Sequence, residues 1–207
     1  MRSIKFIAAG LLLSVFSAAS IATPVITFDE ASGTSGTNSN QSVGWQFDVL
    51  SPISVTGLGW YDQGQDGLGV AHEVGIWDSA GVLLASAIVP AGTTGTLDGV
   101  YRKVLISTLN LGVGTGYIVG GLNSSNSGDR LAANVTQVVD SSIRYIDATF
   151  SGVNGIFERP TNFSTATTGF YGPMFFIEDT ASVPAPATLA LFGLGLTGLG
   201  WSRRKKA

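Results

Sequence analysis

Ser42-Val43-Gly44-Trp45-Gln46-Phe47-Asp48-Val49 is the stretch whose pattern decides the fold class. Large apolar residues occupy every second position, and successive side chains of a β-strand point to opposite faces. Val43, Trp45, Phe47 and Val49 therefore share one face of a predicted strand. We expect that face to lie in the core.

Similar short runs recur on both sides of this strand, and no stretch between the two ends shows a sustained 3.6-residue apolar period. Further strands are predicted over residues 25–28, 55–61, 73–77, 82–89, 102–109, 116–121, 142–150 and 174–178. The pattern predicts an all-β fold, a two-sheet antiparallel β-sandwich of jelly-roll type, with a single barrel as the alternative.

The connections between these strands carry turn signals. Asp78-Ser79-Ala80-Gly81 predicts a hairpin turn, because Asp can bond the turn backbone and Gly can adopt positive φ. Residues 32–41 and 122–135 are polar and rich in Gly, Ser and Asn, which predicts exposed loops.

The N-terminal residues have the three parts of a secretory signal peptide. A basic start with Arg2 and Lys5 precedes an apolar run over residues 6–16 and small residues up to Ala22. The apolar run is shorter than the roughly 20 residues that span a bilayer. We predict a signal peptide over residues 1–22, cut by signal peptidase after Ala22, and a β-domain over residues 23–179.

The C-terminal residues have the parts of a second targeting signal. A linker over residues 180–186 contains Pro184-Ala185-Pro186, and an apolar helix is predicted over residues 187–202. The basic tail, residues 203–207, should stay on the cytoplasmic side; its cations are Arg203, Arg204, Lys205 and Lys206. An apolar helix of about 15 residues is about 22 Å long, against about 30 Å of hydrocarbon, which suits transient anchoring in the inner membrane.

This order of parts resembles the PEP-CTERM sorting segment of Gram-negative bacteria that produce exopolysaccharide. The resemblance implies processing by an exosortase-type transpeptidase near the Pro-Ala-Pro tripeptide, followed by release or attachment at the outer surface or in the extracellular matrix. Ala185 stands where the family usually has Glu, which bears on the efficiency of that step.

The same segment is also classified as an ice-binding protein C-terminal domain. Flat ice-binding faces present regular arrays of Thr. Here the clusters at residues 93–96 and 165–168 do not repeat, so the sequence does not favour ice binding.

The body carries a resemblance of its own. Residues 66–68, 72–86, 89–93 and 117–121 are similar to uncharacterised β-sandwich domains of the DUF4082 group. This resemblance implies the fold and no settled activity.

The net charge of the predicted β-domain limits the classes of molecule that it can bind. All fourteen Asp and Glu residues but only five of the eleven Lys and Arg residues lie within residues 23–179, a net charge of −9. Such a body repels phosphates, so we expect no nucleic-acid binding. The chain has no cysteine, which excludes disulfides and thiolate chemistry.

Catalytic signals are weak. His72 is the only histidine, and no G-x-S-x-G motif occurs. We expect His72 to be a hydrogen-bonded structural residue and the protein not to be an enzyme. The alternative is a polysaccharide-modifying hydrolase that uses Asp62, Asp66 or Glu73.

Two further stretches are candidate binding sites. In residues 62–69, Asp62 and Asp66, together with Glu73, are candidate ligands for Ca²⁺, although Asp and Gly are also common in plain turns. Trp60 and Tyr61 must face opposite ways on one strand, so we expect one of them to be exposed and able to stack on a sugar ring. The alternative is that the tryptophans fill the core.

The sequence therefore predicts an exported, exosortase-sorted protein of the cell surface or extracellular matrix. We expect it to be non-catalytic and associated with exopolysaccharide or biofilm. Possible Ca²⁺ aside, no cofactor is expected.

Overall fold

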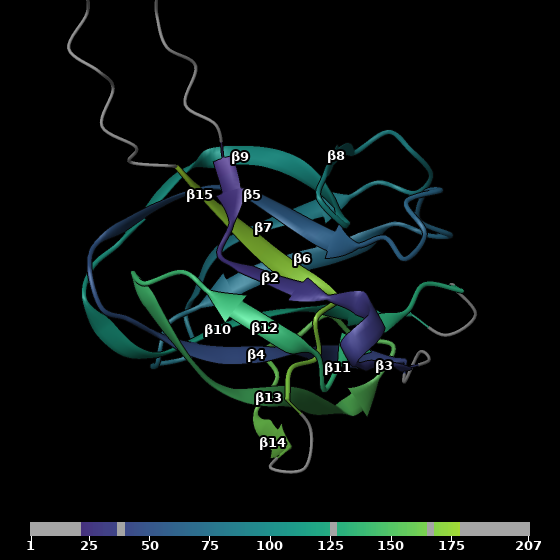
Figure 1. The fold of residues 1–207 in the computed structure, drawn as a ribbon. Coiled ribbons are helices and arrows are strands. Elements are labelled where there is room, and N and C mark those ends of the chain that lie inside the picture. The colour runs from purple at the N-terminus through teal and green to yellow at the C-terminus, as the bar shows by residue number, and fades with distance from the viewer. Residues whose placement is uncertain (1–21, 37–39, 125–127, 165–167, 179–207) are drawn as a thin grey trace, which may run out of the picture. The chain divides into compact units, whose positions relative to one another are not determined.

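The computed structural model describes residues 22–36, 40–124, 128–164 and 168–178, and these fold entirely as β-strands and loops apart from one 3-10 turn (Figure 1). All strand pairings in this part are antiparallel. The prediction of an all-β antiparallel fold is confirmed.

Two larger sheets and two short ribbons make up the domain. The five-stranded sheet has the order β1 (Ala22–Pro24), β15 (Pro173–Glu178), β5 (Ile53–Tyr61), β9 (Tyr101–Leu111) and β8 (Thr96–Asp98). The six-stranded sheet has the order β14 (Asn162–Ser164), β13 (Ile143–Asn154), β4 (Gln41–Val49), β10 (Gly114–Asn123), β6 (His72–Trp77) and β7 (Leu83–Val89). The ribbons pair β11 (Leu131–Ala133) with β3 (Thr34–Gly36), and β12 (Thr136–Val139) with β2 (Ile26–Asp29), which the 3-10 turn Glu30–Ser32 follows.

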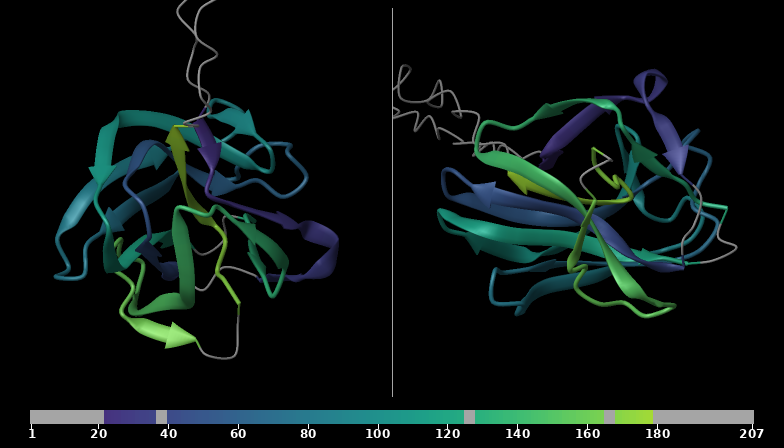
Figure 2. Two further views of the ribbon diagram at one scale, coloured as in Figure 1. Left: turned by 60° about the vertical axis from the view of Figure 1, so that its left-hand side comes forward. Right: turned by 90° about the horizontal axis from the view of Figure 1, so that it is seen from below.

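The core lies between the two larger sheets (Figure 2). Val43, Trp45, Phe47 and Val49 are each at most 2% exposed, so the apolar face predicted for this strand is confirmed. The ring of Phe175 in β15 lies 5.5 Å from that of Trp45 and 4.8 Å from that of Phe47. The indole Nε1 of Trp45 donates to the Pro173 carbonyl at 3.2 Å, so β4 and β15 join the sheets across the core.

The outer face of the six-stranded sheet is covered by residues 155–160. Gly44, Gly120 and Gly75 lie opposite one another on three neighbouring strands. A Cβ built on Gly120 would lie 2.7 Å from Pro160, and one built on Gly75 would lie 2.9 Å from Phe157. Gly120 and Gly75 therefore leave the space into which this covering segment packs, whereas a Cβ on Gly44 would meet the backbone of β10 at Val119 and Gly120.

All nine predicted strands are present, with ends shifted by a few residues. The two predicted loops are partly wrong, because residues 32–41 contain β3 and residues 122–135 contain β11, and these strands pair with each other. Their composition is polar, but each supplies the hydrogen-bond partners that the other backbone needs.

The predicted hairpin between β6 and β7 is confirmed. The Asp78 carboxylate accepts from the Val82 N–H at 2.8 Å, and the Gly81 N–H donates to the Asp78 carbonyl at 3.1 Å. Gly81 has φ +88°, which requires the conformational freedom of glycine.

The predicted signal peptide up to residue 21 and everything after residue 178 lie outside the described residues. Ala22, the last residue of that predicted peptide, pairs with Glu178 in the five-stranded sheet. Among the described residues, no helix has the length and apolarity to cross a bilayer.

Candidate functional site

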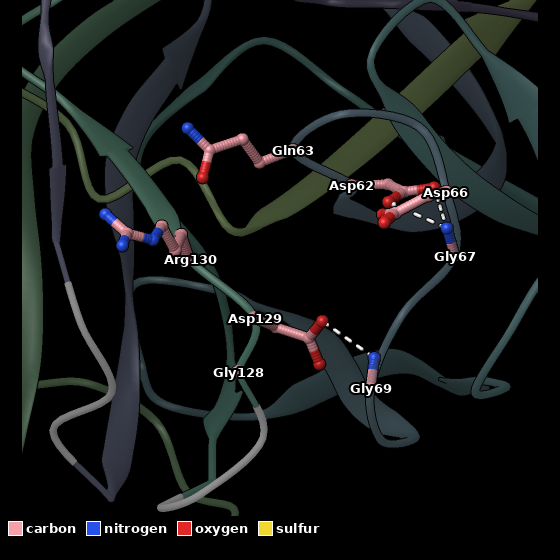
Figure 3. A pocket seen from close by; sticks show the side chains of 8 residues that line it. All are labelled: Asp62, Gln63, Asp66, Gly67, Gly69, Gly128, Asp129 and Arg130. Atoms are coloured by element: carbon pink, nitrogen blue, oxygen red, sulfur yellow. Dashed lines mark hydrogen bonds between the residues drawn. The ribbon is translucent and has the colours of Figure 1, made fainter.

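A polar pocket of about 300 Å³ opens between the loop that follows β5 and the segment that precedes β11 (Figure 3). Among the residues that the structure describes, no aliphatic or aromatic side chain lines it. The lining residues are Asp62, Gln63, Asp66, Gly67, Gly69, Gly128, Asp129 and Arg130.

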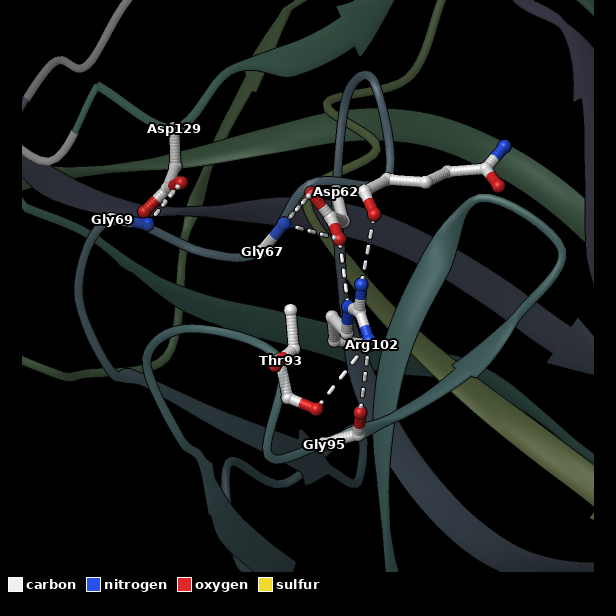
Figure 4. Close-up of polar contacts among 8 residues, drawn as sticks. Asp62, Gly67, Gly69, Thr93, Gly95, Arg102 and Asp129 are labelled. Atoms are coloured by element: carbon white, nitrogen blue, oxygen red, sulfur yellow. Dashed lines mark hydrogen bonds and ion pairs between the residues drawn. The ribbon is translucent and has the colours of Figure 1, made fainter.

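Asp62 forms one buried anchor of this pocket and is only 2% exposed. Both carboxylate oxygens accept from the Gly67 N–H, at 3.2 and 3.1 Å. Oδ2 also accepts from Nε of Arg102 at 2.7 Å (Figure 4). The carboxylate therefore closes its own loop and ties it to β9.

Arg102 extends this anchor to two loops (Figure 4). Its guanidinium donates to the carbonyl of Gln65 at 2.9 Å, of Gly95 at 3.3 Å and of Thr93 at 3.5 Å. One side chain, 6% exposed, thus binds a carboxylate and three carbonyls. That set of oxygens is what a hard cation would otherwise collect.

Asp129 forms the second anchor. Its carboxylate accepts from Nε2 of His72 at 2.8 Å, from the Gly69 N–H at 2.8 Å and from the Val70 N–H at 3.2 Å. Burial by itself would raise the pKa of Asp129, but the hydrogen bonds from His72, Gly69 and Val70 outweigh burial and lower that pKa below its ordinary value. Asp129 is therefore held as a carboxylate.

His72 supports this anchor from inside the domain and is fully buried. Its Nδ1 lies 3.0 Å from the Leu122 carbonyl, and its ring stacks on Trp60 at 3.9 Å with the planes 3° apart. Both ring nitrogens face acceptors, so both contacts are hydrogen bonds only when both nitrogens carry hydrogen. The expectation that His72 is hydrogen-bonded is confirmed, and its structural role stays a prediction.

Asp66 lies at the exposed rim, with no hydrogen bond or ion pair to any residue that the structure describes. The backbone is held on both sides of it, since the Gln65 carbonyl is bound by Arg102 and the Gly67 N–H by Asp62. Gln65 has φ +60°, a conformation that L residues adopt only when their surroundings enforce it. The loop therefore presents Asp66 from a fixed backbone.

The three predicted Ca²⁺ ligands are only partly brought together. Asp62 and Asp66 line the pocket, whereas Glu73 does not. Successive side chains of a strand point to opposite faces, so Glu73 points away from the face that carries His72. Within the described ranges, no group of three or more His, Asp or Glu side chains is arranged to hold a metal. Ca²⁺ binding stays a prediction, and Arg102 occupies the place next to Asp62.

The expectation that Trp60 or Tyr61 is exposed is wrong. Trp60 is fully buried and Tyr61 is 2% exposed. His72 covers the Trp60 ring, and Phe28 of β2 lies 5.5 Å from the Tyr61 ring, whose hydroxyl donates to Glu30. Alternation places the two rings on opposite faces of β5, but both faces are covered at this point.

Sequence reasoning missed Arg102 and Asp129. Arg102 and Lys103 are adjacent cations at the start of β9, and the sequence alone does not show which of the two is buried. Asp129 lies in a polar segment with no local signal of its partners. The predicted sorting residues, Pro184, Ala185, Pro186, Arg203, Arg204, Lys205 and Lys206, lie outside the described part of the chain.

Comparison with known families gives two matches. A family model described as "Domain of unknown function (DUF4082)" matches residues 29–173, which include the whole pocket. A model described as "PEP-CTERM protein-sorting motif" matches residues 182–205. No curated protein and no solved structure gives a significant match.

Proposed function

This chain belongs to the DUF4082 family and carries a PEP-CTERM sorting motif, and on that premise we propose that its β-domain associates with extracellular polysaccharide at the cell surface or in a biofilm matrix without turning it over. The sorting motif over residues 182–205 is the observation that carries the proposal. It supports export and exosortase sorting to the surface, and the association with polysaccharide is the step we add.

The sheet topology supports a jelly-roll interpretation of the domain. Eight of the strands form two four-stranded sets, in the orders β1-β15-β5-β9 and β4-β10-β6-β7. This is the strand order of an eight-stranded jelly roll, a fold that lectin domains use. Since fold does not imply function, the topology is compatible with sugar binding and does not by itself establish it.

The local chemistry favours binding over hydrolysis. A glycosidase needs two carboxylates across one sugar, one of them with a raised pKa. Asp62 is held by Arg102 and Gly67, the pKa of Asp129 is lowered, and Glu73 does not line the pocket. Of the pocket carboxylates, Asp66 is thus left without a second carboxylate that is free to act across a glycosidic bond.

Cell fractionation tests the sorting step. In producing cells, an antibody should find the trimmed protein outside the inner membrane, and deletion of the exosortase gene should leave an untrimmed, membrane-associated form. Ala185→Glu, which installs the family's usual residue, should be trimmed at least as fast. An untrimmed protein in the soluble cell interior would contradict export.

Binding and turnover are tested on the exported protein recovered from those cells. It should migrate more slowly in native gels that contain the cells' own exopolysaccharide, with no release of reducing ends. Reducing ends that appear with the wild type and disappear with Asp66→Asn would instead establish the hydrolase alternative.

A further inference from the structure

We infer that the pocket between residues 62–69 and 128–130 binds one uncharged sugar unit, with Asp66 and Gln63 as the side chains that contact its hydroxyls. This inference rests on the proposed function and names the site and the ligand class for it. Three observations carry it: the lining, the charge balance and the way the loop is held.

The lining suits a polyhydroxyl ligand. Every described side chain in it is a carboxylate, an amide or a guanidinium, and three glycines expose backbone groups. A sugar hydroxyl both donates and accepts, so it is matched by the acceptors of Asp66 and the mixed amide of Gln63 (Figure 3). The volume of about 300 Å³ is at the small end of ligand pockets, as one sugar unit requires.

The charges around the pocket are largely matched. Arg102 lies behind Asp62 at 2.7 Å, and Asp66 and Arg130, of opposite sign, complete the lining. The third carboxylate, Asp129, is held by hydrogen bonds from His72, Gly69 and Val70. The site therefore has no excess of cations to attract an acidic polysaccharide, and an uncharged ligand fits it best.

The loop holds the backbone of Asp66 in a fixed conformation before any ligand binds. Asp62 and Arg102 fix the backbone on either side of Asp66, as shown by the contacts to Gly67 and Gln65 (Figure 4). Binding to a fixed loop avoids the entropy cost of ordering it. The two buried anchors thus act as positioning residues, while the rim makes the contacts.

Affinity electrophoresis of the exported protein tests the inference. The cells' own exopolysaccharide is separated by anion exchange into an uncharged and an acidic fraction, and each is cast into native gels. The wild type should be retarded by the uncharged fraction. Asp66→Ala should weaken this binding about tenfold, the equivalent of about 1.4 kcal/mol for a hydrogen bond to a charged group. Gln63→Ala should weaken it less.

Glu178→Ala is the matched control, since it removes an exposed carboxylate from β15, outside the pocket. It should bind as the wild type does, and all variants should keep the wild-type melting temperature because these side chains are exposed.

Each outcome decides between the two claims. Retardation of Asp66→Ala equal to wild type would overturn the pocket assignment and leave the association with polysaccharide standing. Retardation only by the acidic fraction would overturn the uncharged ligand class. No retardation of the wild type by either fraction would overturn both.

Discussion

Residues 62–67 and residues 155–160 both lie against a sheet, but the first segment is attached by buried charge and the second by shape. Asp62 and Arg102 join the first segment to β9 through an ion pair at 2.7 Å. The second segment packs Phe157 and Pro160 over Gly75 and Gly120, with the Phe157 ring 5.2 Å from that of Trp77. The Ser42 hydroxyl ties its backbone to β4, donating to the Ile156 carbonyl and accepting from the Glu158 N–H, and the Gly155 N–H donates to the Asn40 carbonyl just before β4.

The difference shows that residues 62–67 depend on specific charged side chains, whereas residues 155–160 depend on apolar packing. An apolar cover tolerates changes that preserve volume, whereas a buried charge that loses its partner is left desolvated and unpaired. We therefore expect the pocket loop to be sensitive to single polar substitutions and to pH, and the covering segment to be sensitive only to added volume beneath it.

Arg102→Met should have the largest effect. It removes the cation that pairs with the Asp62 carboxylate, which keeps only the Gly67 N–H, and it removes the Arg102 donor from the carbonyls of Gln65, Thr93 and Gly95. The cost should be about 3–5 kcal/mol in the free energy of unfolding. Chemical denaturation measures this cost. The double variant with Asp62→Asn should recover part of it, and a loss below about 1 kcal/mol in the single variant would mean that the pair contributes little.

Gly120→Ala tests the covering segment. The added methyl would meet Pro160 at 2.7 Å, so the free energy of unfolding should fall by about 1–3 kcal/mol. Gly112→Ala is the matched control, because a Cβ there meets nothing within 4 Å. Equal stability of the two variants would show that residues 155–160 yield freely to added volume.

Asp129→Asn should destabilise the pocket wall by roughly 1–2 kcal/mol at neutral pH, since it weakens hydrogen bonds from His72, Gly69 and Val70. The pKa of Asp129 is lowered in the folded protein, so its contribution is present above the unfolded pKa and is lost as pH falls through the folded value. Denaturation curves should therefore converge as the pH falls. A constant difference down to acid pH would contradict this.

Three buried tyrosines and the partly buried Tyr145 should make the domain sensitive to alkali. Burial raises the pKa of Tyr145 to about 12 and raises the pKa of Tyr61, Tyr101 and Tyr171 as well. Their protonated forms stabilise the fold below pH about 10, and this stability is lost as pH rises, because the unfolded chain releases those protons first. Tyrosinate absorbance should rise together with the loss of near-UV circular dichroism. Ionisation of all tyrosines before unfolding would contradict burial.

Calcium should have the smallest effect. With Arg102 already next to Asp62, the melting temperature should move by less than about 1 °C in EDTA or millimolar CaCl₂. A clear rise with CaCl₂, absent with MgCl₂, would instead support a cation at Asp62 and Asp66 and would contradict the balance of charge that we describe.

The candidate site was only half visible in the sequence. The Asp- and Gly-rich run 62–69 marked the loop, and this loop does line the pocket. Its opposite wall comes from residues 128–130, about sixty positions further along the chain, and nothing local in that polar segment indicates a partner. The sequence predicted that residues 62–69 bind a cation. In the structure Arg102, which is distant in sequence, already binds the Asp62 carboxylate and the Gln65 carbonyl of this loop.

By itself, the sequence determined nine of the fifteen described strands, the hairpin at residues 78–81 and the sorting motif at residues 182–205. Those features follow from local periodicity, turn chemistry and the order of residues along the chain. Only the tertiary structure decided that Trp60 and Tyr61 are buried and that His72 meets Asp129. Burial and pairing depend on which faces the sheets cover, and the two-residue period of a strand gives the faces without saying what lies against them.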